Sequence, residues 1–341
     1  MASKVQSLVQ PSDASTNLLS YQQRRFYILS LIKRLLPYIP MWEDAQKTTI
    51  PEHAGGFGSS NGIVSWHKFT ALDDISTLST TALTEGSAPE SLDLAITEIT
   101  SYLEQFGDWI KITDLAATAS LDNVMQEAMS LLAESAGLKL SRVMRTALLS
   151  GTTTTVSPVA VANIANIDVI TGNLIKKVAR TLRTANAPAF PDGFYRGVIH
   201  PYQSYDLQGD SLWQDISKYD ASIASQGGNS IIRGEVGRIH GVRFRESTEI
   251  FKGVNGGSSS STYHAWVYGP DAYGCLDFKS QAVPSIDTAT GKGMNIHLQP
   301  VNQPTKDDPL GQWGFVSWKA SFATKVIDPN RIVGLKTGAT Q

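Results

Sequence analysis

Apolar residues recur at helical spacing most clearly between residues 121 and 151. We expect one long helix here, capped by Ser120 and stopped by Gly151, with Gly137 softening its middle. Thirty residues at the helical rise span about 45 Å, which is longer than a compact domain usually needs. The apolar stripe consists of Leu121, Met125, Ala128, Leu132, Ala136, Val143 and Ala147.

Two further segments combine an apolar side with a basic one. Residues 17–40 form an amphipathic helical pattern that Pro37 ends. Its apolar side would pack on a partner subunit or on the body of the fold, and a helix lying on a membrane surface is the alternative. Residues 171–186 predict another helix, with Thr171 as its candidate cap and Pro188 closing it. Its polar side carries Lys176, Lys177, Arg180 and Arg183.

Alternating β-branched and aromatic residues predict extended structure in the region between these helices. Residues 63–72 read as a strand, and after a polar stretch the chain returns in extended form over 92–117. Two long extended segments flanking a polar tip predict a protruding hairpin. Because such a hairpin cannot bury both of its faces alone, a partner surface is implied.

The last 150 residues show short strands, short helices and glycine turns. In "GVIHPYQSYDL", a strand is expected to turn at His200 into a short helix, since Pro201 suits a first helical position and cannot continue a strand ladder. Tyr202, Tyr205 and Leu207 would pack that helix on the sheet. His200 is therefore expected to be a structural joint, not a catalytic base or a metal ligand. Residues 255–263 predict an exposed loop, and 311–338 are expected to be extended.

Composition excludes several classes of protein. The chain of 341 residues has a formal net charge of −2, so no global basic charge marks a nucleic-acid binder. Cys275 is the only cysteine, which excludes an intrachain disulfide and a cysteine-based zinc site. The apolar run at 26–32 is too short to span a bilayer and is followed by no cleavage site, so we expect neither a membrane helix nor a signal peptide.

Catalytic motifs are present only in fragments. Gly58, Ser60 and Gly62 match G-x-S-x-G, but they follow a glycine-rich loop and precede a strand, the reverse of a nucleophile elbow. Residues 288–294 lack the spacing of a phosphate loop, and the adjacent Asp307 and Asp308 are expected in a solvated turn. The six histidines are scattered without metal-ligand spacing. We therefore predict no catalytic residue, no cofactor and no metal site.

The basic stretch "GRIHGVRFRES" at 237–247 leaves three interpretations open. Arg243 and Arg245 would lie on one face of a strand, with Val242 and Phe244 on the other. That face could be solvated, could form salt bridges at the edge of a neighbouring subunit, or could follow a phosphate backbone with Arg238.

Taken in order, these segments resemble a known family. "RRFYILSLIKRLLPYIP", "IVSWHKFTAL", "LTEG", "LEQFGDWIKITDLA", the long helix, "LIKKVARTLRTANAP", "YRGVIHP" and "GEVGRIHGVRFRES" are similar to the phage-N4-type family of tailed-bacteriophage major capsid proteins. The resemblance runs from about residue 21 to about residue 250, and the "LEQFGD…ITD" and "GEVGRIHGVRF" blocks are its most specific parts. Beyond residue 255 it is one of pattern only.

The resemblance implies an α+β chain with the Hong Kong 97-like phage capsid fold. It places an N-terminal arm at 1–50, an extended hairpin loop at 51–100, and a peripheral domain at 101–195 with a long spine helix at 120–150. An axial domain would occupy 196–300, and 301–341 would return to the peripheral domain. No local motif around Lys68 matches the covalent crosslink of some relatives, so no crosslinking residue is assigned.

The implied function is structural. Many copies would self-assemble into hexamers, pentamers and an icosahedral shell, the virion capsid, which encloses packaged double-stranded DNA held non-specifically at its inner face. Portal, scaffold and cement or decoration proteins are further possible partners, and a membrane is not. Expected intersubunit contacts are Phe26 and Leu29 in the arm, Trp66 and Phe69 in the loop, and Arg243 and Arg245 in the axial domain. The alternatives are an encapsulin-like cellular shell protein and, from another class, a hydrolase or binding module.

Overall fold

A computed structural model describes residues 34–48, 63–69, 85–86, 96–120, 124–210, 235–255, 258–277, 294–299, 301 and 308–340. Several sequence predictions lie outside these residues: the amphipathic segment up to residue 33 with Phe26 and Leu29, the G-x-S-x-G match at 58–62, most of the hairpin loop, and Asp307. No helix in the described ranges is long and apolar enough to cross a membrane.

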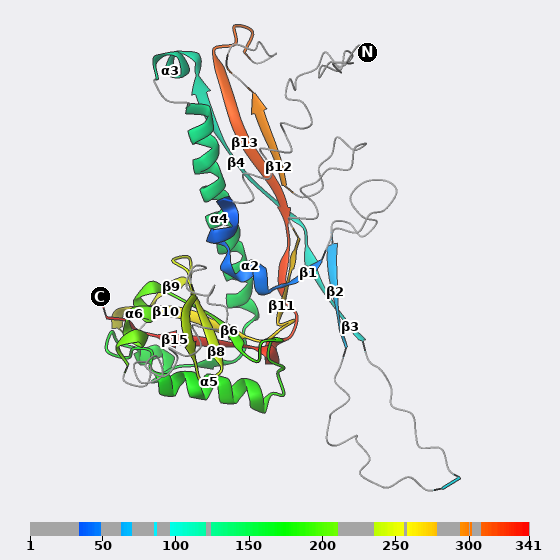
Figure 1. Ribbon diagram of the computed structural model, residues 1–341, viewed down its shortest axis with the longest axis vertical. Coiled ribbons are helices and arrows are strands. Elements are labelled where there is room, and N and C mark those ends of the chain that lie inside the picture. Colours follow the sequence, from blue (N-terminus) through cyan, green and yellow to red (C-terminus); the bar gives the residue numbers. More distant parts are fainter. Residues whose placement is uncertain are drawn as a thin grey trace, which may run out of the picture.

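The long helix α4 (Val124–Gly151) runs beside a three-stranded antiparallel sheet (Figure 1). The sheet has the order β12 (Met294–Gln299), β13 (Trp313–Phe322) and β4 (Glu104–Thr113). One face of the sheet packs on the helix, because alternate residues of each strand point the same way. Val316, Trp318 and Ala320 of β13 are buried there with Leu132, Ala136 and Leu140 of α4. The helix and the sheet therefore share one core.

Two details of this part correct the sequence analysis. The extended segment expected to reach residue 117 ends at Thr113, where helix α3 (Asp114–Ala119) begins, since the Thr113 hydroxyl accepts a hydrogen bond from Ala116 N. Gly137 does not soften α4, which is continuous. A Cβ at Gly137 would lie 2.8 Å from the Tyr38 Cβ, so the glycine lets the N-terminal segment approach the helix closely.

A second, seven-stranded sheet forms the compact body beside the lower end of α4 (Figure 1). Its strands lie in the order β5 (Thr155–Val156), β15 (Ile332–Thr337), β10 (Ser258–Tyr268), β6 (Tyr195–Ile199), β8 (Val242–Glu246) and β7 (Glu235–Ile239), and β9 (Phe251–Asn255) also pairs with β10. Helix α5 (Gly172–Thr184) buries its apolar side here. Helix α6 (Pro201–Gly209) follows β6, and a short 3-10 turn, η2, covers Val161–Asn163.

Two smaller sheets connect these parts. Strands β1 (Gln46–Thr48), β11 (Tyr273–Leu276) and β14 (Thr324–Val326) form one, and β2 (Ile63–Phe69) and β3 (Ile96–Tyr102) form the antiparallel root of the hairpin. The N-terminal segment contains η1 (Leu36–Tyr38) and α2 (Pro40–Asp44), and η5 (Pro329–Arg331) precedes β15.

The sheets divide the chain differently from the predicted segments. Of the last segment, 301–341, strand β13 pairs with β4, whereas β15 lies inside the seven-stranded sheet between β10 and β5. Strand β5 and helix α5, expected with 101–195, belong to the same body as β6 and β8. The reason is long-range pairing, which joins strands that lie far apart in the sequence.

The Asp308 carboxylate also differs from expectation. It is only 6% exposed, and its Oδ2 accepts the backbone N–H of Trp313 at 3.0 Å. It therefore fixes the start of β13 and does not stand in solvent. Helix α5 begins after Thr171 as expected, although the Thr171 side chain makes no capping hydrogen bond.

Candidate functional site

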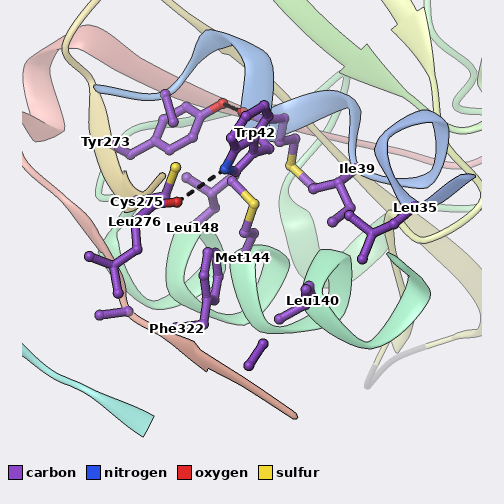
Figure 2. Close-up of a cluster of buried hydrophobic side chains, with 14 of the residues drawn as sticks. Leu35, Ile39, Trp42, Leu140, Met144, Leu148, Tyr273, Cys275, Leu276 and Phe322 are labelled. Carbon is purple, nitrogen blue, oxygen red and sulfur yellow. Dashed lines mark hydrogen bonds between the residues drawn. The ribbon is translucent and has the colours of Figure 1, made fainter. Parts of the chain in front are cut away.

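The segment from Arg34 to Thr48 is bound to the body by a buried apolar contact (Figure 2). Leu35, Ile39 and Trp42 lie over α4 and β11. The indole Nε1 of Trp42 donates to the carbonyl oxygen of Leu276 at 3.1 Å, and the Tyr273 hydroxyl donates to the carbonyl oxygen of Met41 at 2.6 Å. Each large apolar side chain buried in this way contributes about 1.5–3 kcal/mol. Their partners are Leu140, Met144, Leu148, Cys275 and Phe322.

Arg245 of β8 provides the polar part of the same contact. Its Nη1 lies 3.1 Å from the carbonyl oxygen of Pro40, 3.2 Å from Glu43 Oε2 and 3.3 Å from Asp44 Oδ2. The side chain thus binds the end of α2 from within the same chain. Any intersubunit role of Arg245 stays a prediction.

Asp44 is almost completely buried at this contact. Arg196 Nε lies 3.9 Å from its Oδ1, and the Tyr268 hydroxyl donates to its Oδ2 at 3.1 Å. Burial raises the pKa of Asp44 although Arg245 and Arg196 lower it. Burial likewise holds the pKa of Tyr268 and of Tyr273 well above the usual range, so both hydroxyls stay protonated and act as donors.

Arg243, the second arginine of the predicted pair, has partners within the chain as well. Its Nη1 lies 3.1 Å from Asp192 Oδ2, and its guanidinium stands 5.6 Å from the centre of the Phe194 ring. The sequence placed Arg243 and Arg245 on one strand face correctly, but this face is not solvated. It is covered by α2 and by the loop that carries Asp192.

The root of the hairpin is fixed to the body through its inward face. Trp66 is buried against β11, where a Cβ at Gly274 would lie 2.3 Å from the indole Nε1. The ammonium of Lys68 lies 3.0 Å from Asp328 Oδ1. Because only a glycine leaves room for the indole, Trp66 and Gly274 together position the hairpin root against the body. Trp66, expected at an intersubunit contact, is thus a core residue of its own chain.

The outward face of the same two strands is exposed and carries apolar side chains at its two ends. Phe69 lies opposite Ile96 at one end of the ladder and Ile63 lies opposite Tyr102 at the other, with the polar Ser65, His67, Glu98 and Thr100 between them. Phe69 is 58% exposed, Ile96 55% and Tyr102 75%. Figure 1 shows the root standing away from the compact body. Of the candidate contacts in the described residues, Phe69 is the most exposed.

A second exposed aromatic surface lies on the outer face of the β12–β13–β4 sheet. Trp109 is 60% exposed and faces Ser317 across the ladder, and the rings of Trp313 and Phe315 lie 6.2 Å apart at a tilt of 41°. Lys111 Nζ stands 4.6 Å from the centre of the Trp313 ring. A groove of about 570 Å³ crosses this face at Gly107.

His200 is the structural joint that the sequence indicates. Its Nδ1 accepts the N–H of Tyr202 at 3.2 Å, and its own N–H donates to Gln203 Oε1 at 3.2 Å, which caps α6. Burial and the charge of Lys252 lower its pKa. The expectation that side chains of α6 pack on the sheet is correct for Leu207, which is buried. It is wrong for Tyr205, which is 74% exposed because the helix turns that side to solvent.

Other reactive groups do not converge within the described residues. No three histidine, cysteine or acidic side chains there come close enough to hold a metal ion. Burial raises the pKa of Cys275 to about 12, so the thiol stays neutral among its apolar neighbours.

The sequence analysis did not predict that Trp42 and Asp44 attach the N-terminal segment to the body. Their short segment, "PMWED", carries no periodic pattern, and their partners lie more than 200 residues away. The one available signal was Pro40, which suits the first turn of a helix.

Three comparisons relate this chain to known proteins. The sequence profile of a family described as "Phage capsid protein" matches residues 97–334, well over half of the chain. No curated protein sequence matches this chain. The capsid of Ralstonia phage GP4 has a TM-score of 0.65 at 14% identity, covering 100% of this chain and 99% of that chain.

Two further solved structures are similar over nearly their whole lengths. The cyanophage Pam1 capsid asymmetric unit has a TM-score of 0.56 at 15% identity, with 99% of each chain covered. The holo-SrpI encapsulin complex from Synechococcus elongatus PCC 7942 has a TM-score of 0.51 at 10% identity, covering 97% of this chain and 94% of that chain. At such identities these likenesses show a shared fold, the mixed α+β fold of phage capsids.

Proposed function

The chain belongs to the phage capsid protein family, and from this premise we propose how it builds its shell. It is a major capsid protein of a tailed phage and forms an icosahedral shell, the virion capsid, by self-association. In the proposal, the fold is the Hong Kong 97-like one of the phage-N4-type family. Helix α4 is its spine helix, residues 1–50 form the arm and 51–100 form the extended loop.

The exposed apolar pair of Phe69 and Ile96, at one end of the hairpin root, carries this proposal. Both side chains are more than half exposed in a single chain, as is Tyr102 at the other end of the ladder, while Trp66 fixes the opposite face to the body. A two-stranded ribbon exposed in this way gains stability when it lies on another surface. In the shell, that surface belongs to a neighbouring copy. Repeated around a ring, such contacts give hexamers and pentamers and then a closed shell.

The shell is proposed to enclose packaged double-stranded DNA without reading its sequence. Portal, scaffold and cement or decoration proteins would join it as partners. An encapsulin-like shell has a related fold and is the second candidate, but the match to a phage capsid family favours the phage shell. Purification of the shells tells the two apart, since a phage head contains DNA and an encapsulin a cargo protein.

Electron microscopy of Phe69 variants tests the proposal. Phe69→Asp places a charge on the exposed face and should abolish shells while leaving a folded subunit, since the side chain has few contacts within the chain. Phe69→Leu keeps the face apolar and is the matched control, which should still form shells. If the Asp variant forms shells of normal size and number, this face is not an assembly contact. If the unsubstituted chain forms only monomers or dimers at every concentration and salt, the shell function itself fails.

A further inference from the structure

Helix α5 exposes a basic surface that forms no ion pair with the residues that the structure describes. Its apolar side is buried on the seven-stranded sheet through Leu174, Ile175, Val178, Ala179 and Leu182. The opposite side carries Lys176, Lys177, Arg180 and Arg183, all exposed, and the helix contains no acidic residue. We call these four side chains the α5 basic surface.

Several cations elsewhere in the described residues pair with acids of the same chain. Arg142 pairs with Glu249, Lys139 with Asp108, and Arg331 with Asp328. Arg196, Arg243 and Arg245 are paired in the same manner. No described residue forms an ion pair with any member of the α5 basic surface. In a chain with a net charge of −2, the α5 basic surface concentrates four exposed cations on about two turns of one helix.

The positive charge reaches beyond the helix. A Cβ at Gly241 would lie 3.0 Å from Arg183 Nη2, so this guanidinium lies against the turn between β7 and β8. At the same turn, burial and then the charge of Lys176 lower the pKa of His240, against an opposing effect of Asp210. The Asp210 carboxylate itself accepts the N–H of Gly172 at 2.6 Å, which fixes it at the start of α5.

We propose that the α5 basic surface faces the interior of the shell and binds the phosphate backbone of the packaged double-stranded DNA. Lys176, Arg180 and Arg183 follow one another along one side of the helix over about 10 Å. Duplex DNA presents a negative charge every ~1.7 Å of its axis, so several phosphates lie within reach of these three side chains. Contacts of this kind carry no sequence information, which suits a genome that must be packed whatever its sequence. The inference rests on the proposed shell function.

Binding of the purified capsid protein to a duplex of random sequence is the first test. The variant Lys176→Gln/Lys177→Gln/Arg180→Gln/Arg183→Gln removes four charges from the α5 basic surface. The control Lys111→Gln/Lys252→Gln/Lys319→Gln/Lys325→Gln removes four exposed charges elsewhere, so both variants have the same net charge. At moderate salt, the α5 variant should bind at least about tenfold more weakly, and the slope of log affinity against log salt should fall by about 3. In the control variant, the loss of affinity and the fall in the salt slope should each be no more than about a third of those in the α5 variant.

The location inside the shell is tested on DNA-filled heads. An amine reagent coupled to a polymer too large to enter the shell should leave Lys176 and Lys177 unlabelled in intact heads and label them after disruption. Ultraviolet crosslinking of intact heads should join peptide 172–186 to DNA. Labelling of either lysine on intact heads would overturn the proposal, as would crosslinks from this peptide to protein in place of DNA.

Electron microscopy separates this inference from the function on which it rests. The α5 variant should still form closed shells, because its charges take no part in the apolar hairpin contact. An α5 variant that binds DNA like the unsubstituted chain but forms no shells would assign the surface to a protein partner and reject the DNA contact. If the unsubstituted chain itself forms no shells, the shell function has failed, whatever the duplex measurements give.

Discussion

The carboxylate of Asp44 lies 3.3 Å from the guanidinium of Arg245, although 200 residues separate them in the sequence. Asp44 ends the short helix α2, and Arg245 projects from β8 of the seven-stranded sheet. Their contact is partly buried, and Tyr268 donates to the same carboxylate oxygen. It joins the N-terminal segment to the compact body at a point where Trp42 supplies the apolar attachment. Four predictions follow from this and related contacts.

Asp44 should make stability rise on mild acidification. Since burial raises its pKa above 3.8, the folded chain holds this proton more tightly than the unfolded chain does. Its contribution to the free energy of unfolding therefore increases as the pH falls through the folded pKa, and it stays constant below 3.8. Asp44→Asn cannot titrate, so the difference between unsubstituted and variant subunits should grow from neutral pH to about pH 4. Urea unfolding at a series of pH values measures it, and a shrinking difference would contradict the assigned direction.

His264 should have the opposite effect in the same pH range. Burial, with a smaller effect of Lys336, lowers its pKa to about 4, so between 6.5 and 4 the unfolded chain binds more protons than the folded one. The stabilisation is complete above pH 6.5 and is lost as the pH falls toward 4. In His264→Gln this loss should disappear, which the same urea series detects. An unchanged pH dependence in that variant would show that the side chain is solvated.

Gly274→Ala should release the hairpin root. The added methyl group would overlap the Trp66 indole, which is only 3% exposed and belongs to the packed core, so we expect a destabilisation of about 2 kcal/mol or more. Gly209→Ala is the control, because a Cβ there meets nothing within 4 Å. Limited proteolysis should cut the first variant near residues 63–102 faster than the control. Equal rates would mean that Trp66 does not hold the root in place.

Deletion of residues 1–36 should block shell closure and leave a folded subunit. The deletion removes Leu35 but keeps Ile39, Trp42 and Asp44, whose contacts attach the remaining segment to the body. Circular dichroism should therefore report a folded chain, while electron microscopy should find no closed shells. Shells of normal size from the deleted chain would show that the arm does not clamp neighbouring copies.

The sequence predicted those elements whose signals are local. The apolar stripe of α4, the strand at Ile63–Phe69 and the turn from β6 into α6 at His200 are each specified by residues within about a dozen positions of one another. The helix start at Thr113 was missed, because a strand pattern covered the capping residue. Both arginines of β8 were placed on the right face, but their acidic partners were not foreseen.

The sequence by itself determined the order of elements, the long helix, the protruding hairpin and the resemblance to a capsid family, since periodicity and turn residues express themselves locally. Only the tertiary structure decided what each exposed or charged side chain does. Trp66 became a core residue and Phe69 an exposed one because β2 turns alternate residues to opposite sides. Arg245 pairs with an acid about 200 residues away, whereas no acid in the described part of the chain forms an ion pair with the α5 basic surface. Partnership of this kind depends on how distant segments fold together, and no local pattern records it.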